Sequence, residues 1–162
     1  GELRQRDLAP YFLEISGSAY SCYVIGYDHW AQEMRTFKLD RLERAQMLDQ
    51  SYEIPPDFDA NEFLSDSWGI MRGERLCEVV LQFSPDVSAL VRERTWHPSQ
   101  NIDELVNGGL LFTVYISDPR EMRPWIRSWG AGVEVLAPAD LRAEMTEHAR
   151  RLAEQYQVSA RW

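Results

Sequence analysis

Residues 35–41 of this chain read Arg35-Thr36-Phe37-Lys38-Leu39-Asp40-Arg41, and an aromatic run at residues 20–27 precedes them. In a β-strand, side chains alternate between two faces, so a strand through residues 35–41 places two arginines and two apolar residues on one face. These are Arg35, Phe37, Leu39 and Arg41. The neighbouring strand lines one face with Tyr23, Ile25 and Tyr27. Because guanidinium binds phosphate and aromatic rings stack on bases, this pattern predicts a concave sheet that binds an anionic ligand with flat rings.

A purely structural interpretation fits the same residues. Aromatic and β-branched residues with a period of two are typical of the buried face of an ordinary sheet. An arginine at each end of a strand is commonly a solvated flank whose aliphatic stem covers apolar surface. The spacing alone therefore leaves both a binding site and a core open.

Three segments, in this order, resemble the WYL domain of bacterial transcriptional regulators. They are Ala9-Pro10-Tyr11-Phe12-Leu13, Ser21-Cys22-Tyr23-Val24-Ile25-Gly26-Tyr27-Asp28 and Arg35-Thr36-Phe37-Lys38-Leu39-Asp40-Arg41-Leu42. The family takes its name from a Trp-Tyr-Leu triplet, and the matching residues here are Cys22, Tyr23 and Val24, so only the tyrosine is kept. The Arg-x-Phe-x-Leu-Asp-Arg pattern is nearly complete and contributes most to the resemblance.

The second half of the chain resembles the extension that often follows a WYL domain, called WCX. The matching segments are residues 78–83, 96–100, 124–130 and 133–142. Together the two resemblances cover nearly the whole chain. They imply an α+β protein: a small Sm-like or SH3-like β-barrel, followed by a ferredoxin-like domain with a C-terminal helix.

The sequence predicts three regions: a WYL-like effector-sensing β domain at residues 1–56, a connector at 57–76 and a WCX-like domain at 77–162. Pro55-Pro56 stops any regular element near the first boundary. Within the connector, Asp59 and Glu62 form a capping-box pattern, which predicts a short helix that ends at about Trp68.

The last region alternates strand and helix signals. Ser84-Pro85 and Asp118-Pro119 each place a capping residue before a proline, and Glu121 completes a second capping box. Asn107-Gly108 predicts a tight turn, and Gly130 predicts a helix end. The strands are expected at residues 78–83, around 102, at 110–117 and at 133–136, the helices after 84 and 118, and a final helix at about 139–156. This β-α-β-β-α-β order is the ferredoxin-like plan.

WYL domains usually carry a further strand before the segment that matches residues 6–10, and a winged helix-turn-helix before that. Neither is found in this sequence. We therefore expect a barrel that lacks its first strand, in a fragment of a longer regulator or in a chain that another polypeptide completes. An unpaired sheet edge tends to recruit another strand.

The composition limits the function classes. The chain has 162 residues, of which 44% are hydrophobic and 12% aromatic, which suits a folded core and excludes a disordered tail. Its net charge is −9. Because DNA phosphates are bound by basic faces, this acidity disfavours promoter binding by the chain itself. A local pair of arginines can still bind a small anion in a pocket.

The sequence gives no sign of a membrane, a metal or a cofactor. No apolar run approaches the roughly 20 residues of a membrane-spanning helix, and no signal peptide is visible, so we expect a cytoplasmic protein. Cys22 and Cys77 form no Cys-x-x-Cys pattern and are expected to be free thiols. The histidines His29, His97 and His148 lie in separate elements without the spacing of metal ligands.

The WYL and WCX resemblance implies the effector-sensing and dimerisation portion of a transcriptional regulator. Its expected partners are a second copy of the chain, an anionic effector (single-stranded DNA or RNA, or a nucleotide), and promoter DNA through the missing N-terminal domain. Matching positions imply Arg35 and Arg41 as phosphate-binding forks and Tyr23 as a stacking or hydroxyl-donating residue. Phe37, which also suits the core, and Tyr11 are further candidates.

Two alternatives remain open, and a third, an enzyme, is weighed against them. The chain could be a dimerisation scaffold that senses nothing, since two of the three namesake residues are replaced. It could sense a small metabolite, by analogy with other ferredoxin-like regulatory domains. An enzyme is not expected, because the sequence has no nucleophile elbow, no phosphate loop and no convergent catalytic set.

Overall fold

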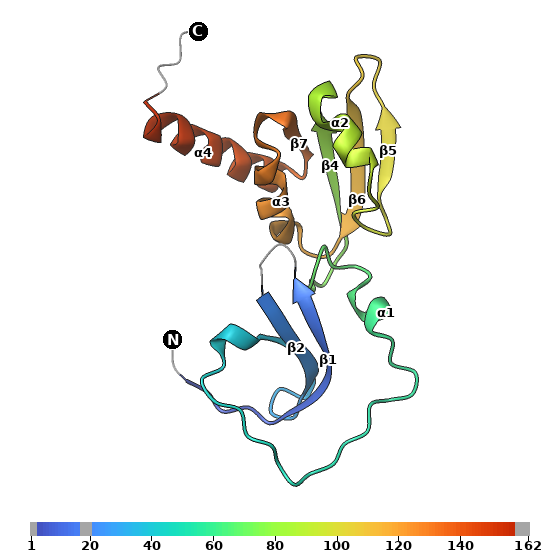
Figure 1. Cartoon of the computed structure of the whole chain (residues 1–162), viewed down its shortest axis with the longest axis vertical. Coiled ribbons are helices and arrows are strands. Elements are labelled where there is room, and N and C mark those ends of the chain that lie inside the picture. Colours follow the sequence, from blue (N-terminus) through green and yellow to red (C-terminus); the bar gives the residue numbers. More distant parts are fainter. Residues whose placement is uncertain (1–2, 17–20, 158–162) are drawn as a thin grey trace. The chain divides into compact units, whose positions relative to one another are not determined.

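The computed structural model describes residues 3–16 and 21–157, and the chain divides into two compact units, residues 1–65 and 66–162 (Figure 1). Each unit contains one antiparallel sheet, with three strands in the first and four in the second, and a long helix ends the second. The predicted α+β class, a small β domain followed by a domain of strands and helices, is confirmed.

The first unit is built on a sheet with the strand order β1-β2-β3. Its strands are β1 (Leu8–Ser16), β2 (Ser21–Asp28) and β3 (Glu33–Lys38). β2 is the central strand and is buried on both faces, since Val24 and Ile25 project to opposite sides and both are buried. Both outer strands are more exposed. In this unit the described residues form a three-stranded sheet where a small barrel was predicted.

β3 is shorter than the sequence pattern predicts. It ends at Lys38, and a 3₁₀ turn, η1 (Leu39–Arg41), follows and is closed by a hydrogen bond of 3.0 Å from the Leu42 N–H to the Leu39 carbonyl. The alternation of faces therefore stops at Lys38. The prediction that four side chains from residues 35–41 share one strand face was wrong, and only Arg35 and Phe37 do so.

A short helix, α1 (Ala60–Leu64), follows the long connection after η1. The Asp59 carboxylate caps it by accepting the N–H of Asn61 at 2.7 Å and of Glu62 at 3.3 Å. The capping signal at Asp59 is confirmed, although the helix ends at Leu64 and not near Trp68. Phe58 and Phe63, on either side of its start, pack on the aromatic residues of β1.

The second unit has the predicted ferredoxin-like order. Its elements are β4 (Cys77–Phe83), α2 (Pro85–Arg92), β5 (Asn101–Glu104), β6 (Leu110–Ile116), η2 (Pro119–Met122), α3 (Arg123–Ser128), η3 (Gly130–Gly132), β7 (Val133–Ala137) and α4 (Ala139–Gln155). The sheet order is β5-β6-β4-β7, and all neighbours are antiparallel. The predicted β-α-β-β-α-β arrangement is thus confirmed.

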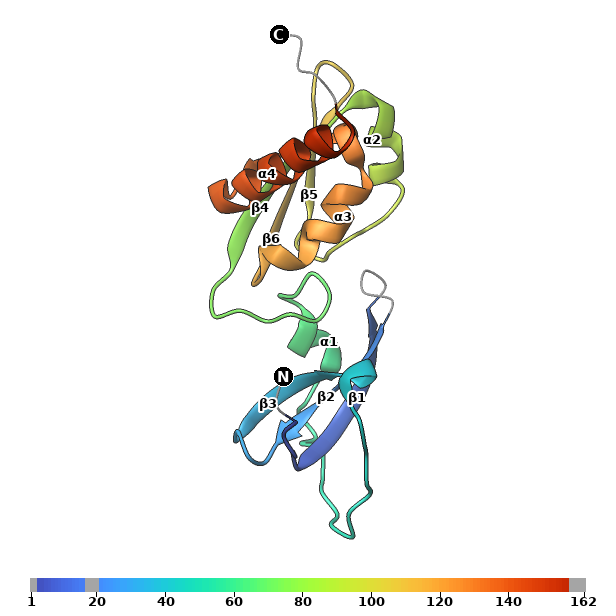
Figure 2. The same ribbon diagram turned by 90° about the vertical axis from the view of Figure 1, so that its left-hand side faces the viewer.

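The core of this unit lies between the sheet and the helices α2 and α3, which cover the same face (Figure 2). Alternate residues of β4 and β6 are buried there with Val91 of α2 and Ile126 of α3. Several aromatic rings fill the space beside them: Phe83, Phe112, Trp68, Trp96, Trp125 and Trp129. Each large apolar side chain buried here stabilises the unit by roughly 1.5–3 kcal/mol.

Glu121 does not complete the predicted capping box. Asp118 does cap η2, by accepting the N–H of Arg120 at 3.0 Å. The carboxylate of Glu121 instead turns away and accepts three backbone N–H groups from a distant segment. The donors are Gly69 at 2.9 Å, Ile70 at 2.8 Å and Met71 at 3.1 Å. We call residues 66–73 the connector strap; these bonds fix it to the rest of the second unit.

Helix α4 packs into the core through its first half only. Leu141 is buried in the core and Met145 packs against it. Further along, the Leu152 side chain is 41% exposed and Tyr156, just after the helix, is 72% exposed. Across residues 3–16 and 21–157, no helix combines the length and the apolar character needed to cross a membrane.

Candidate functional site

The pairing of β2 with β3 divides the candidate residues between two faces of the first sheet. Tyr23 lies opposite Lys38, whereas Arg35 lies opposite Gly26. Directly opposed residues of an antiparallel pair project to the same face, and Tyr23 and Gly26 project to opposite faces of β2. We therefore distinguish the Tyr23 face, with Tyr23 and Lys38, from the Arg35 face, with Gly26 and Arg35. The sequence interpretation that set Arg35 beside the β2 tyrosines was wrong on this point.

On the Arg35 face, the charge of the arginine is already balanced. The Arg35 guanidinium forms an ion pair with Glu33, two residues earlier on the same strand, and both side chains are about half exposed. Phe37 lies opposite Val24, a buried core residue, and is itself half-buried. This position suits the core role that the sequence left open for Phe37.

On the Tyr23 face, Tyr23 is half-buried and lies opposite Lys38, the last residue of β3. The Lys38 side chain is 27% exposed, and its Nζ is 3.5 Å from an Asp40 carboxylate oxygen. The sequence analysis did not select Lys38. Alternation from Arg35 places Lys38 on the face opposite Arg35. Which β2 residue lies beside Lys38 depends on the strand register, and the sequence does not contain the register.

The turn η1 is anchored to β2 through Asp40. The Ser21 hydroxyl donates a hydrogen bond to the Asp40 carboxylate. This bond, with a smaller contribution from the charge of Lys38, holds the pKa of Asp40 below its ordinary value of 3.8, so Asp40 is ionised at neutral pH. The next residue, Arg41, is exposed and forms no ion pair with any described residue. η1 thus combines a fixed carboxylate with an available guanidinium.

Tyr11 lies at a β-bulge, between the register positions of Pro10 and Phe12. Its ring meets Phe58 edge to face, with ring centroids 4.9 Å apart. An aromatic pair of this kind stabilises packing. The structure therefore places Tyr11 in the contact between β1 and the segment before α1, and it joins neither the Arg35 pair nor the Tyr23 pair.

A second polar cluster fixes the turn between β2 and β3. Asp28 is fully buried and accepts the N–H of Trp30 at 2.9 Å and of Ala31 at 3.1 Å. Arg6 Nη1 lies 3.5 Å from the other Asp28 oxygen, and the guanidinium lies 4.0 Å from the centre of the Trp30 ring. The two backbone bonds satisfy one Asp28 oxygen, whereas the other oxygen and Arg6 Nη1 are buried with no hydrogen-bond partner among the described residues. The ion pair between them offsets the buried charge and ties residue 6 to the sheet.

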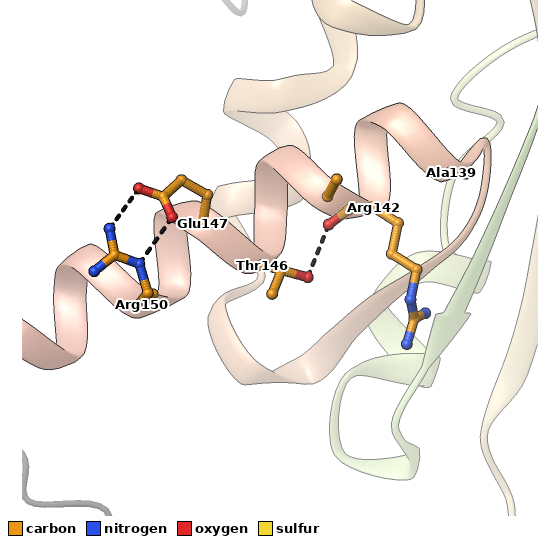
Figure 3. A pocket seen from close by; sticks show the side chains of 6 residues that line it. Ala139, Arg142, Thr146, Glu147 and Arg150 are labelled. Carbon is orange, nitrogen blue, oxygen red and sulfur yellow. Dashed lines mark hydrogen bonds and ion pairs between the residues drawn. The ribbon is translucent and has the colours of Figure 1, made fainter.

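A shallow hollow of about 380 Å³ runs along one side of α4 and is lined by that helix alone (Figure 3). Arg150 forms an ion pair with Glu147 at 2.8 Å within it. Because the guanidinium is already neutralised, this hollow is a weak candidate for an anion. Among the residues that the structure describes, no group of three His, Cys, Asp or Glu side chains could hold a metal ion.

Two family models match the chain. The WYL domain model matches residues 1–47, and the WCX domain model matches residues 75–153. Among curated proteins, none matches. The chain is similar to a solved structure, proteasome accessory factor B/C (PafBC) of Arthrobacter aurescens, with 24% identity and a TM-score of 0.37, over 88% of this chain and 21% of that one. It thus spans about a fifth of that chain's length.

Proposed function

Because this chain joins a WYL domain to a WCX domain, we propose that it is the effector-sensing and dimerisation portion of a bacterial transcriptional regulator. The WYL domain would bind an anionic effector in the cytoplasm, either single-stranded nucleic acid or a nucleotide. Binding would favour one arrangement of two protomers, and a separate DNA-binding domain would respond at the promoter. This role requires binding and no catalysis.

One observation supports the binding site most strongly. Arg41 is exposed and without an ion-pair partner among the described residues, at the end of a turn that Asp40 anchors to β2. An exposed guanidinium on such a turn is suited to bind phosphate, because its fork of donors is rigid and always charged. Tyr23 and Lys38, opposite each other on the adjacent strands, would supply a ring and a second positive charge.

The other sequence candidates have weaker support. Arg35 is engaged with Glu33 and projects to the opposite face from Tyr23. Phe37 and Tyr11 occupy packing positions beside Val24 and Phe58. We retain them as candidates for a secondary contribution, and we place the main contact at Arg41.

A second candidate function is assembly without sensing. The end of α4 leaves Leu152 and Tyr156 exposed, and exposed apolar residues on a helix suit contact with a partner helix. A chain that forms dimers but binds no oligonucleotide would support this role alone.

The test is a titration of the protein into a fluorescein-labelled oligothymidylate, followed by fluorescence anisotropy. We expect saturable binding by the wild type and a loss of about tenfold or more in affinity for Arg41→Ala, since a hydrogen bond to a charged group contributes roughly 1.5–3 kcal/mol. Arg44→Ala is the matched control, because Arg44 is also exposed and lies three residues away. Equal affinities of Arg41→Ala and wild type would contradict the proposed site.

A further inference from the structure

We propose that Lys38 is a second phosphate contact of this site. In the absence of the effector, the Asp40 carboxylate pairs with Lys38, and a phosphate group of the effector displaces it. The inference rests on the proposed function and deepens it, because it names a residue outside the arginine pattern and a means of regulation. The chain's own carboxylate thus competes with the effector for Lys38.

The position of Lys38 supports its role as a contact. It is the last residue of β3, it lies opposite Tyr23 on the Tyr23 face, and it immediately precedes the turn that carries Arg41. A ligand that stacks on Tyr23 and pairs with Arg41 would thus bring its phosphates to the end of β3. Stacking on an aromatic ring next to positive charges is how proteins commonly hold single-stranded nucleic acid.

The position of Asp40 supports its role as a competitor. Its carboxylate lies 3.5 Å from Lys38 Nζ, and the Ser21 hydroxyl holds it in place by a hydrogen bond. The Asp40 side chain is nevertheless 64% exposed. Water and salt screen an exposed ion pair, so the pair is weak and open to exchange. A phosphate group brings more charge and more acceptor oxygens than a carboxylate and can replace it.

This arrangement gives opposite signs for two neighbouring substitutions. Asp40→Asn keeps an oxygen that can accept the Ser21 hydrogen bond and removes the competing charge, so affinity for the labelled oligothymidylate should rise about two- to fivefold. Lys38→Met keeps the aliphatic stem and removes the positive charge, so affinity should fall about fivefold or more. If Asp40 acted only as an anchor for the turn, Asp40→Asn would leave affinity unchanged or lower it.

A chemical measurement on the wild-type protein tests the same inference. Lys38 is the only lysine of the chain, so acetylation of lysine by an N-hydroxysuccinimide ester reports on this residue alone after proteolysis and mass spectrometry. We expect the oligothymidylate to slow acetylation of Lys38 several-fold. Protection by the oligothymidylate alone would identify a nucleic-acid strand as the source of the phosphate, and protection by inorganic pyrophosphate as well would show that a small phosphate compound suffices.

The outcomes separate this inference from the proposed function. Binding that depends on Arg41 but not on Lys38, with unchanged acetylation of Lys38, would overturn the inference and leave the anion site at Arg41. An increase in affinity for Asp40→Asn together with protection of Lys38 would support it. If the wild type binds neither the oligothymidylate nor pyrophosphate, the proposed function fails, and the inference fails with it.

Discussion

The carboxylate of Glu121 accepts the backbone N–H of Ile70 at 2.8 Å, although the two residues are 51 positions apart in the sequence. The same carboxylate also accepts the N–H groups of the two residues beside Ile70. Both Glu121 and Ile70 are buried, so these bonds form away from water. One side chain next to α3 therefore fixes the path by which the chain enters the second unit.

Glu121→Ala should destabilise the second unit by roughly 2–3 kcal/mol, because it leaves backbone donors in the connector strap without an acceptor. Trp68, in the strap, lies 4.8 Å from Trp125, ring centre to ring centre, and both pack against the core of the unit, so tryptophan fluorescence during urea unfolding follows the loss of that core. Glu74→Ala removes the same charge from an exposed position nearby and serves as the control. Equal midpoints for the two variants would argue against the strap's contribution.

Gly26→Ala should disrupt the pairing of β1 with β2. A Cβ atom on Gly26 would lie 2.2 Å from the backbone oxygen of Ala9, and backbone cannot move aside as a flexible side chain can. We expect a loss of at least about 2 kcal/mol in the first unit, seen as collapse of its dispersed amide signals in NMR spectra. Cys22→Ala, on the same strand, should keep those signals. A well-dispersed first unit in Gly26→Ala would show that the two strands pair differently.

The stability of α4 should fall in acid. Arg150 and Arg151 lower the pKa of Glu147 from its ordinary 4.5 to about 2, through hydrogen bonds and their charges. A carboxyl whose pKa is lower in the folded state stabilises that state above its unfolded pKa, and the contribution disappears as pH falls from about 4.5 toward 2. NMR titration of the Glu147 side chain checks this, with Glu147→Gln as the variant that removes the effect. A midpoint near the ordinary value would contradict it, and high salt should move the midpoint upward.

Arg35→Ala should weaken oligothymidylate binding less than Arg41→Ala does, by about threefold or less, because Arg35 is paired with Glu33 and lies on the face opposite Tyr23. Anisotropy titrations of the two variants, side by side, make the comparison. If Arg35→Ala causes the larger loss, the effector binds on the Arg35 face and the site assignment made from the register is wrong.

Much of the second unit could be predicted from local signals. Gly130 has a φ of 55° and Gly108 a φ of 84°, in the left-handed region where glycine is favoured. The sequence predicted a helix end at Gly130 and a tight turn at Gly108. The strand and helix order followed from prolines, caps and alternation, because each of these signals acts within a few residues. Asp59 and Asp118 cap helices for the same local reason.

The candidate site depended on relationships that the sequence does not contain. Local sequence signals predicted the alternation of faces correctly for residues 35–38 but extended the strand to Arg41, where the structure has the turn η1. Three partners follow only from the folded chain: Arg35 meets Gly26, Lys38 meets Tyr23, and Asp40 bonds to Ser21. The physical reason is that alternation has a period of two, so a shift of one residue between two strands exchanges every partner, and the register is set by packing across the whole sheet. Competition for hydrogen-bond acceptors is non-local in the same way. The Glu121 carboxylate accepts backbone N–H groups of the connector strap and so does not cap the start of η2.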